Sequence, residues 1–315
     1  MDFFEEHSQY ASCSLCPHAC GVDRTAGKRG VCGASDSLKL GRAALHMWEE
    51  PCLVGEQGSG AVFFSYCPLH CVYCQNKPLA SGEGVEISVD QLASLFLRLQ
   101  NDEHAANINL VTPTHFLPHI VAALKKIKGS KLTIPVVYNT SGYESLKALR
   151  QLRGLVDIYL TDYKYALPKL ARNLSRAPHY EQVALDALEE MLLQTGMIAS
   201  TKSTIELDSD TGLLKQGVII RHLVLPGNLD NSFQALNALY ERFGSKLTLS
   251  IMNQFTPLDY CGDLSAYNLR GTVSEEEYNQ VLDYADYLGF EDYFWQDGPA
   301  CEESFVPAFD GTGVY

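Results

Sequence analysis

The stretch SYCPLHCVYCQN (residues 65–76) contains three cysteines, Cys67, Cys71 and Cys74, at the spacing C-x3-C-x2-C. Thiolates are soft ligands for zinc, copper(I) and iron–sulfur clusters. Structural zinc takes four protein ligands, so here it would have to recruit Cys52, which lies upstream. A [4Fe–4S] cluster held by three cysteines instead keeps one iron open for a further ligand. The triplet therefore favours a cluster with a catalytic coordination position, with zinc as the alternative.

Short apolar runs and amphipathic stretches alternate on either side of the triplet. The runs are rich in Val, Ile and Tyr, and we expect them to form strands at 61–66, 108–111, 134–138, 156–160, 218–225 and 247–251. We expect helices at 88–103, 115–128, 143–152, 180–195, 232–243 and 275–288. Strands followed by helices indicate parallel pairing with right-handed crossovers.

Polar residues follow most of these expected strands, for example at 112–114, 139–141 and 161–164. Such groups at the carboxyl ends of successive strands are typical of β/α barrels, although a doubly wound sheet would also fit the alternation. We predict an α/β fold, an incomplete (β/α)6 TIM-type barrel over 59–315. Residues 1–58 are expected to form a small cysteine-rich, metal-binding extension.

The composition excludes some functions. Twenty-four Lys and Arg stand against 38 Asp and Glu, a net charge of −14, which argues against nucleic-acid binding. The first residues lack the basic and apolar regions of a secretion signal, and no apolar run is long enough to span a membrane. We expect a cytoplasmic protein whose ten cysteines are thiols or metal ligands.

The triplet directly after the first expected strand of a barrel resembles the signature of the radical S-adenosylmethionine (radical SAM) superfamily. Tyr73, just before the third cysteine, also matches that signature. The resemblance implies that Cys67, Cys71 and Cys74 hold a [4Fe–4S] cluster whose open iron binds S-adenosylmethionine. It further implies reductive cleavage of this molecule to a 5′-deoxyadenosyl radical, which abstracts hydrogen.

Within the superfamily, the chain resembles the pyruvate formate-lyase activating enzymes and an activase-like branch. Segments carrying the resemblance include GSGAVFFSYC, NINLVTPTHF, VVYNTSGYE, VDIYLTDYKY, VIIRHLVLPGN, MNQFTP and FVPAFDGTGVY. Thr112 and Thr114 stand where the activases have a Gly-Gly-Glu motif for the methionine amine, so two hydroxyls replace a carboxylate. Asn139, Thr140 and Ser141 occupy the place of Asp-Thr-Asn.

Further strand-end residues acquire roles by this resemblance. Asp162 and Lys164 match an Asp-x-Lys motif and are expected near a monovalent cation and the methionine carboxylate; the alternative is a pair at the barrel rim. Arg221 and His222 are adjacent on a strand and point to opposite sides. We expect Arg221 to face the lumen and to meet a carboxylate of the cofactor or the substrate. Asn253 and Gln254 are expected beside the adenine.

Four more cysteines, Cys13, Cys16, Cys20 and Cys32, lie among glycines near the N-terminus. Their clustering predicts a second metal site, either zinc or an iron–sulfur cluster.

The function expected from the resemblance is a radical SAM oxidoreductase, with flavodoxin or ferredoxin as electron donor. Its expected target is a glycine of a partner glycyl-radical protein. One alternative is a radical enzyme that modifies another peptide or a small molecule. Another is a non-catalytic iron–sulfur electron carrier or a zinc-stabilised interaction module.

Overall fold

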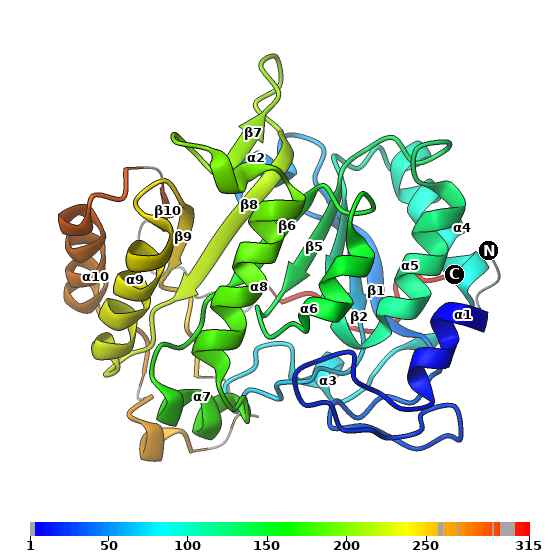
Figure 1. Ribbon diagram of the computed structural model, residues 1–315, viewed down its shortest axis with the longest axis horizontal. Helices are drawn as coiled ribbons and strands as arrows, with labels where there is room; N and C mark the ends of the chain where they lie inside the picture. The colour runs from blue at the N-terminus through cyan, green and yellow to red at the C-terminus, as the bar shows by residue number, and fades with distance from the viewer. Residues whose placement is uncertain (1–3, 258–260, 262, 270, 292, 297–305) are drawn as a thin grey trace.

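The computed structural model describes residues 4–257, 261, 263–269, 271–291, 293–296 and 306–315. Its strands form one mixed sheet in the order β10-β9-β8-β6-β5-β4-β2-β1-β3, with β7 beside β8 (Figure 1). The strands are β1 (Lys39–His46), β2 (Ser59–Phe64), β3 (Val85–Glu86), β4 (Ile108–Val111), β5 (Val136–Thr140), β6 (Ile158–Asp162), β7 (Ile205–Leu207), β8 (Leu214–Leu223), β9 (Thr248–Met252) and β10 (Tyr293–Trp295).

The expected strands are the parallel part of this sheet, from β2 through β4, β5, β6 and β8 to β9. Most of their residues are buried, which is why they read as continuous apolar runs. The mixed α/β fold with a largely parallel, partial barrel is therefore confirmed. β10 extends the parallel part beyond β9 and was not expected.

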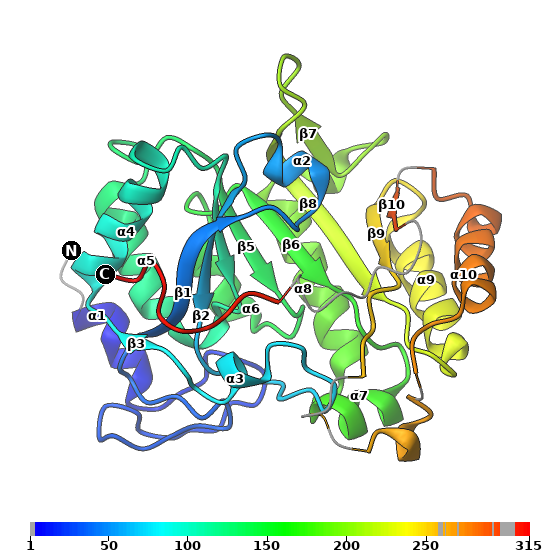
Figure 2. The same cartoon turned by 180° about the vertical axis from the view of Figure 1, so that it is seen from behind.

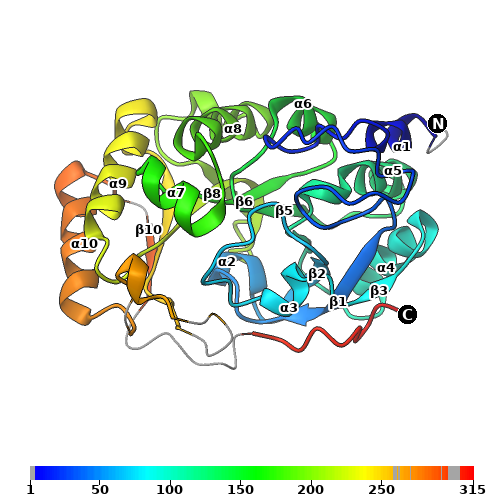
Figure 3. The same ribbon diagram turned by 90° about the horizontal axis from the view of Figure 1, so that it is seen from below.

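Helices cover the outer side of the curved sheet, and the opposite side is left open (Figure 3). The longer helices are α4 (Val89–Asn101), α5 (Leu117–Ile127), α7 (Pro168–Ser175), α8 (Tyr180–Gln194), α9 (Leu229–Phe243) and α10 (Glu275–Leu288). The shorter ones are α1 (Phe4–His7), α2 (Pro51–Val54), α3 (Lys77–Ala80) and α6 (Leu146–Leu149). Ser88 and Ser274 begin α4 and α10 with capping boxes. No helix of the described ranges is long and apolar enough to cross a membrane.

The residues before position 59 are joined to the barrel by the same sheet. β1, not expected from the sequence, pairs antiparallel with β2, so the boundary expected at residue 59 falls between two neighbouring strands. After β1, helix α2 inserts Leu53 into a core that includes Val137, Leu160 and Ile219. This segment closes the amino-terminal end of the barrel, while the triplet loop lies at the other end.

The last described segment, 306–315, crosses the open side of the sheet (Figure 2). Its backbone pairs with β1, Gly311 N donating to Gly41 O at 2.9 Å and Thr312 O accepting from Ala43 N at 3.0 Å. Phe309 packs against Phe63 with ring centroids 5.5 Å apart. The last described segment thus lies against β1, the strand next to β2, which leads into the triplet loop.

Candidate active site

The triplet loop follows β2 and turns sharply twice. Tyr66 (φ 73°) and His70 (φ 47°) adopt the left-handed conformation that non-glycine residues rarely take, and each directly precedes a cysteine. Left-handed residues of this kind can form backbone nests, which are common at iron–sulfur sites. Backbone N–H groups meet the loop's own sulfurs, as where Leu69 N donates to Cys67 Sγ at 3.5 Å.

A cavity of about 260 Å³ lies at the carboxyl ends of the strands. Most of the residues predicted for the site line it: Cys67, Cys71, Cys74, Tyr73, Thr112, Asn139, Thr140, Ser141, Asp162, Lys164, Arg221 and Gln254. Thr114, Asn253 and the four N-terminal cysteines are not among its lining residues. Trp48 and Glu49, which follow β1, also line the cavity and were not singled out from the sequence.

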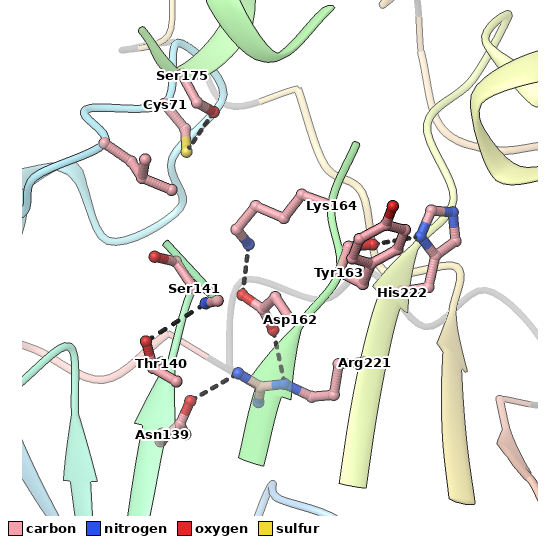
Figure 4. A network of polar contacts seen from close by, with 12 residues as sticks. Cys71, Asn139, Thr140, Ser141, Asp162, Tyr163, Lys164, Ser175, Arg221 and His222 are labelled. Carbon is pink, nitrogen blue, oxygen red and sulfur yellow. Dashed lines mark hydrogen bonds and ion pairs between the residues drawn. The ribbon is translucent and has the colours of Figure 1, made fainter. Parts of the chain in front are cut away.

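Three charged side chains form the centre of the cavity (Figure 4). Asp162 Oδ2 meets Lys164 Nζ at 2.5 Å, and Asp162 Oδ1 accepts from Arg221 Nε at 2.9 Å. Burial alone would raise the pKa of Asp162, but Lys164 and Arg221 hold it below its usual value. Both oxygens of the carboxylate expected to bind a monovalent cation are therefore already paired with cationic side chains.

Arg221 points into the cavity, whereas His222 lies on the outer side of β8, bonded to Tyr163 O and Ser232 Oγ. The arginine continues the network, since its Nη2 donates to Asn139 Oδ1 at 2.7 Å. Its Nη1 lies 3.3 Å from Glu49 Oε2.

Glu49 is the anionic residue of the site that sequence reasoning missed. Its Oε1 accepts from Asn109 Nδ2 at 3.1 Å and Asn139 Nδ2 at 3.2 Å. Burial raises its pKa to about 7 even though Arg221 acts in the opposite direction. Nothing in its local sequence indicates this role, because only the path of the chain after β1 brings Glu49 to β4, β5 and β8.

A second carboxylate, Glu144, bonds Thr114, one of the two threonines expected to bind an amine, and also Thr140. Thr114 Oγ1 donates to Glu144 Oε1 at 2.5 Å, and Thr140 Oγ1 donates to the same oxygen. Burial raises the pKa of Glu144 to about 7, against the lowering effect of these hydrogen bonds. The turn that lacks the activases' carboxylate is thus supplied with one from the next strand end. The signal available in the sequence was a Glu four residues after Thr140.

A hydrogen-bonded chain runs from Cys71 to Tyr73. Ser175 Oγ donates to Cys71 Sγ at 2.9 Å and is itself 2.6 Å from Tyr165 Oη. Tyr165 Oη and Tyr73 Oη are 2.5 Å apart. On another side, Gln75 Nε2 donates to the backbone carbonyl of Gln254 at 2.9 Å, which ties the triplet loop to the segment after β9.

The chemistry of the donor set fits a cluster. Cys67, Cys71 and Cys74 are free thiols around one cavity, and burial, followed by the neighbouring Cys71, raises the pKa of Cys67 to about 12. A coordinating metal reverses this preference and deprotonates the thiol. Three cysteines around one cavity suit a cubane, in which each cysteine binds a different iron.

The four N-terminal cysteines lie outside the cavity but beside the triplet loop. His18 Nε2 donates to Pro68 O at 3.0 Å, and His70 Nε2 donates to Val31 O at 3.0 Å. The loop that carries these cysteines therefore supports the triplet loop from outside.

Comparison with known proteins gives distant relatives and a family model that matches part of the chain. The chain is 27% identical over 288 residues to an uncharacterised protein, MJ0674, of Methanocaldococcus jannaschii, covering 88% of this chain and 75% of the relative. SuiB of Streptococcus suis bound to S-adenosylmethionine is similar over 73% of this chain and 48% of SuiB, with 13% identity and a TM-score of 0.47. This chain thus spans about half of the length of SuiB.

A radical SAM methyltransferase from Sphaerobacter thermophilus is similar over 76% of this chain and 67% of that enzyme, with 13% identity and a TM-score of 0.46. The family model of the Radical SAM superfamily matches residues 61–199. Those residues contain the triplet and the strand ends from β2 to β6, which line most of the cavity. The triplet and most of the cavity around it therefore lie in the part of the chain that is similar to the Radical SAM superfamily.

Proposed function

We propose that this enzyme removes a hydrogen atom from the Cα of a glycine in a partner protein, with flavodoxin or ferredoxin as electron donor. The observation that carries the proposal is the single cavity that joins the three triplet cysteines to the charged group of Asp162, Lys164 and Arg221. The choice of glycine rests on the resemblance to the activases, and the structure adds a rim suited to a macromolecular substrate.

In this proposal Cys67, Cys71 and Cys74 hold a [4Fe–4S] cluster, and the cavity beside them receives S-adenosylmethionine. Bound together, the cluster and S-adenosylmethionine supply a carbon-centred radical that abstracts hydrogen. The protein's contribution is to bind, orient and exclude water. Lys164 and Arg221 both reach into the cavity, and we assign Lys164 to the carboxylate of the bound methionine moiety.

Paired charges in the floor of the cavity keep its polar groups fixed. Lys164 is buried, and although burial lowers its pKa, Asp162 and Cys71 raise it above the ordinary value, so the side chain stays cationic. Arg221 and Glu49 hold Asn139 between them, which leaves Thr112 and Ser141 at the strand ends to meet the ligand. A prearranged polar surface of this kind needs little reorganisation when ligand binds.

The rim of the cavity supports a polypeptide as the substrate. Trp48 is 59% exposed and also lines the cavity, and the neighbouring Met47 is 46% exposed. Exposed aromatic residues beside a polar site are typical anchors of protein partners. A glycine in a partner's loop has no side chain and can approach the bound radical source more closely than any other residue.

The test is activation of candidate glycyl-radical proteins under strictly anaerobic conditions. Enzyme reconstituted with iron and sulfide is reduced with S-adenosylmethionine and each candidate, and the glycyl radical is followed by electron paramagnetic resonance. We expect a radical on at least one candidate. W48A should lower its yield while uncoupled 5′-deoxyadenosine formation continues, and the C67A/C71A/C74A variant should lose both.

Two results would contradict the proposal. If 5′-deoxyadenosine forms but no candidate acquires a radical and W48A behaves as wild type, the enzyme modifies another peptide or a small molecule. If reduction yields no 5′-deoxyadenosine at all, the chain is an electron carrier or an interaction module.

A further inference from the structure

Arg24 is a fully buried arginine without a carboxylate partner. None of its surface is exposed, and among the described residues no Asp or Glu oxygen lies within ion-pair distance of its guanidinium. Its donors reach backbone carbonyls instead, Nε meeting Ser35 O at 2.9 Å and Nη1 meeting His115 O at 2.7 Å. The guanidinium also lies 4.3 Å from the ring centroid of Tyr10.

An arginine remains charged in proteins, and a buried charge without a counter-ion costs several kcal/mol. The protein must therefore provide negative charge nearby. Cys13 can carry it as a thiolate, and its Sγ lies 3.9 Å from Arg24 Nη1. Arg24 also acts electrostatically on Cys32, whose pKa it lowers against the larger effect of burial.

The other N-terminal cysteines surround the same position. The sulfurs of Cys20 and Cys32 lie 3.2 and 3.7 Å from the place a Cβ on Gly30 would occupy, so a larger residue there would press on both. Burial raises the pKa of the Cys16 thiol, and Cys32 and Cys13 lie near enough to raise it further. Ala19, directly before Cys20, has a φ of 41°, the same left-handed arrangement that precedes Cys67 and Cys71.

We propose that Cys13, Cys16, Cys20 and Cys32 bind a second [4Fe–4S] cluster as four thiolates, and that Arg24 balances the negative charge of this centre. Assembly releases four protons, one from each thiol, and leaves a net negative centre beside the guanidinium. Arg24 acts as a positioning residue through its N–H group toward the Cys13 sulfur.

The backbone before the cysteines favours a cluster over zinc. Ala19 adopts the left-handed conformation directly before Cys20, as Tyr66 and His70 do before two cysteines of the triplet. Residues in this conformation form backbone nests, which are common at iron–sulfur sites.

The experiment uses the full chain with the triplet removed, C67A/C71A/C74A, so that only the N-terminal centre can load. After anaerobic reconstitution we expect about four irons and four sulfides per chain. A variant that also carries C13A/C16A/C20A/C32A should bind no iron or sulfide. On the triplet-free background, R24M and R24Q should lose iron to a chelator about 10–100-fold faster, while R24K, which keeps the charge, should lie closer to the parent.

A second measurement separates this role from a merely structural one. The melting temperature of each variant is compared with and without the cluster. Metal loading should raise it most in the parent, less in R24K and least in R24M. The metal-free parent and R24K both hold a buried positive charge at this position, whereas metal-free R24M does not. If R24M fails to fold, R24Q and R24K decide the comparison.

Three outcomes would overturn the proposal. A triplet-free chain that binds no metal refutes the site, and one that takes up one zinc and no iron refutes the cluster. Equal chelator sensitivity and equal metal-dependent shifts in R24K and both neutral variants refute the role of Arg24.

Discussion

The two cysteine groups of this chain differ in what surrounds them. The triplet opens onto a cavity with Lys164, Arg221 and Asp162, where cations and anions are paired before any ligand arrives. The four N-terminal cysteines do not line that cavity. The buried cation beside them, Arg24, has no carboxylate partner among the described residues. A site that binds a substrate needs an accessible cavity in which the protein's own charges are already paired. A purely structural metal site can instead use its cysteine thiolates to neutralise a nearby buried cation.

The largest expected difference between the two groups is in catalysis. C71A should reduce 5′-deoxyadenosine formation to background, because the triplet is the proposed binding site of the catalytic cluster. C13A/C16A should retain most of the cleavage, provided that circular dichroism shows an intact fold. The measurement is 5′-deoxyadenosine by chromatography after anaerobic reduction. An equal loss of 5′-deoxyadenosine formation in C71A and C13A/C16A would contradict the assignment of catalysis to the triplet alone.

The next effect concerns the paired charges of the cavity. D162N should lower the free energy of unfolding by about 3–5 kcal/mol, because it leaves Lys164 and Arg221 buried with one anion fewer. Urea denaturation of the metal-free protein measures the change. The matched control is D90N, which breaks an exposed ion pair with Lys126 and should leave the midpoint almost unchanged. A similar midpoint for both variants would mean that the cavity charges are not coupled as the geometry indicates.

A third effect lies at the boundary of the two groups, at Glu144, which acts electrostatically on Cys16 and bonds Thr140. Its pKa is raised by burial to about 7, so between the ordinary value and 7 the folded state holds a proton that the unfolded state has lost. The contribution of Glu144 to the free energy of unfolding therefore falls as the pH rises from its ordinary pKa to 7, and it stays constant above pH 7.

Relative to E144Q, the wild type should lose about 1–3 kcal/mol of unfolding free energy between pH 5 and pH 8. Denaturation curves of both proteins at the two pH values measure the difference. A constant difference across the window would show that Glu144 is ionised throughout.

The smallest expected effect is electronic. S175A removes the hydroxyl that donates to Cys71 Sγ and should move the reduction potential of the triplet cluster to more negative values without loss of iron. The control T195V changes a hydroxyl that bonds only helix carbonyls and should leave the potential unchanged. Spectroscopic redox titration distinguishes the two. An unchanged potential in S175A would mean that this hydrogen bond does not influence the cluster.

The sequence predicted the parallel strands because strands such as β4 and β6, buried on both faces, are continuous apolar runs between helices. It also predicted most of the cavity lining, since polar residues at the ends of neighbouring parallel strands must meet. It did not predict β1, whose residues 39–46 mix small, charged and apolar side chains. Glu49 and Trp48 were missed for the same reason, because their place depends on the path of β1.

Arg24 and Glu144 illustrate a second limit. A charged residue in a glycine-rich loop or a turn is normally exposed, and the local sequence gives no sign of burial. Both are buried because other segments enclose them, including His115, 91 residues from Arg24, and Thr114, 30 residues from Glu144. Pairing of this kind is a tertiary property.

The antiparallel pairing of β1 with β2 has a practical consequence. A fragment that begins at β2 would expose the edge of β2 that normally pairs with β1. It would also lack Leu53, which packs into the core at the amino-terminal end of the barrel. We therefore expect such a fragment to aggregate on expression. Residues 1–58 and the barrel should accordingly be expressed and purified as one polypeptide.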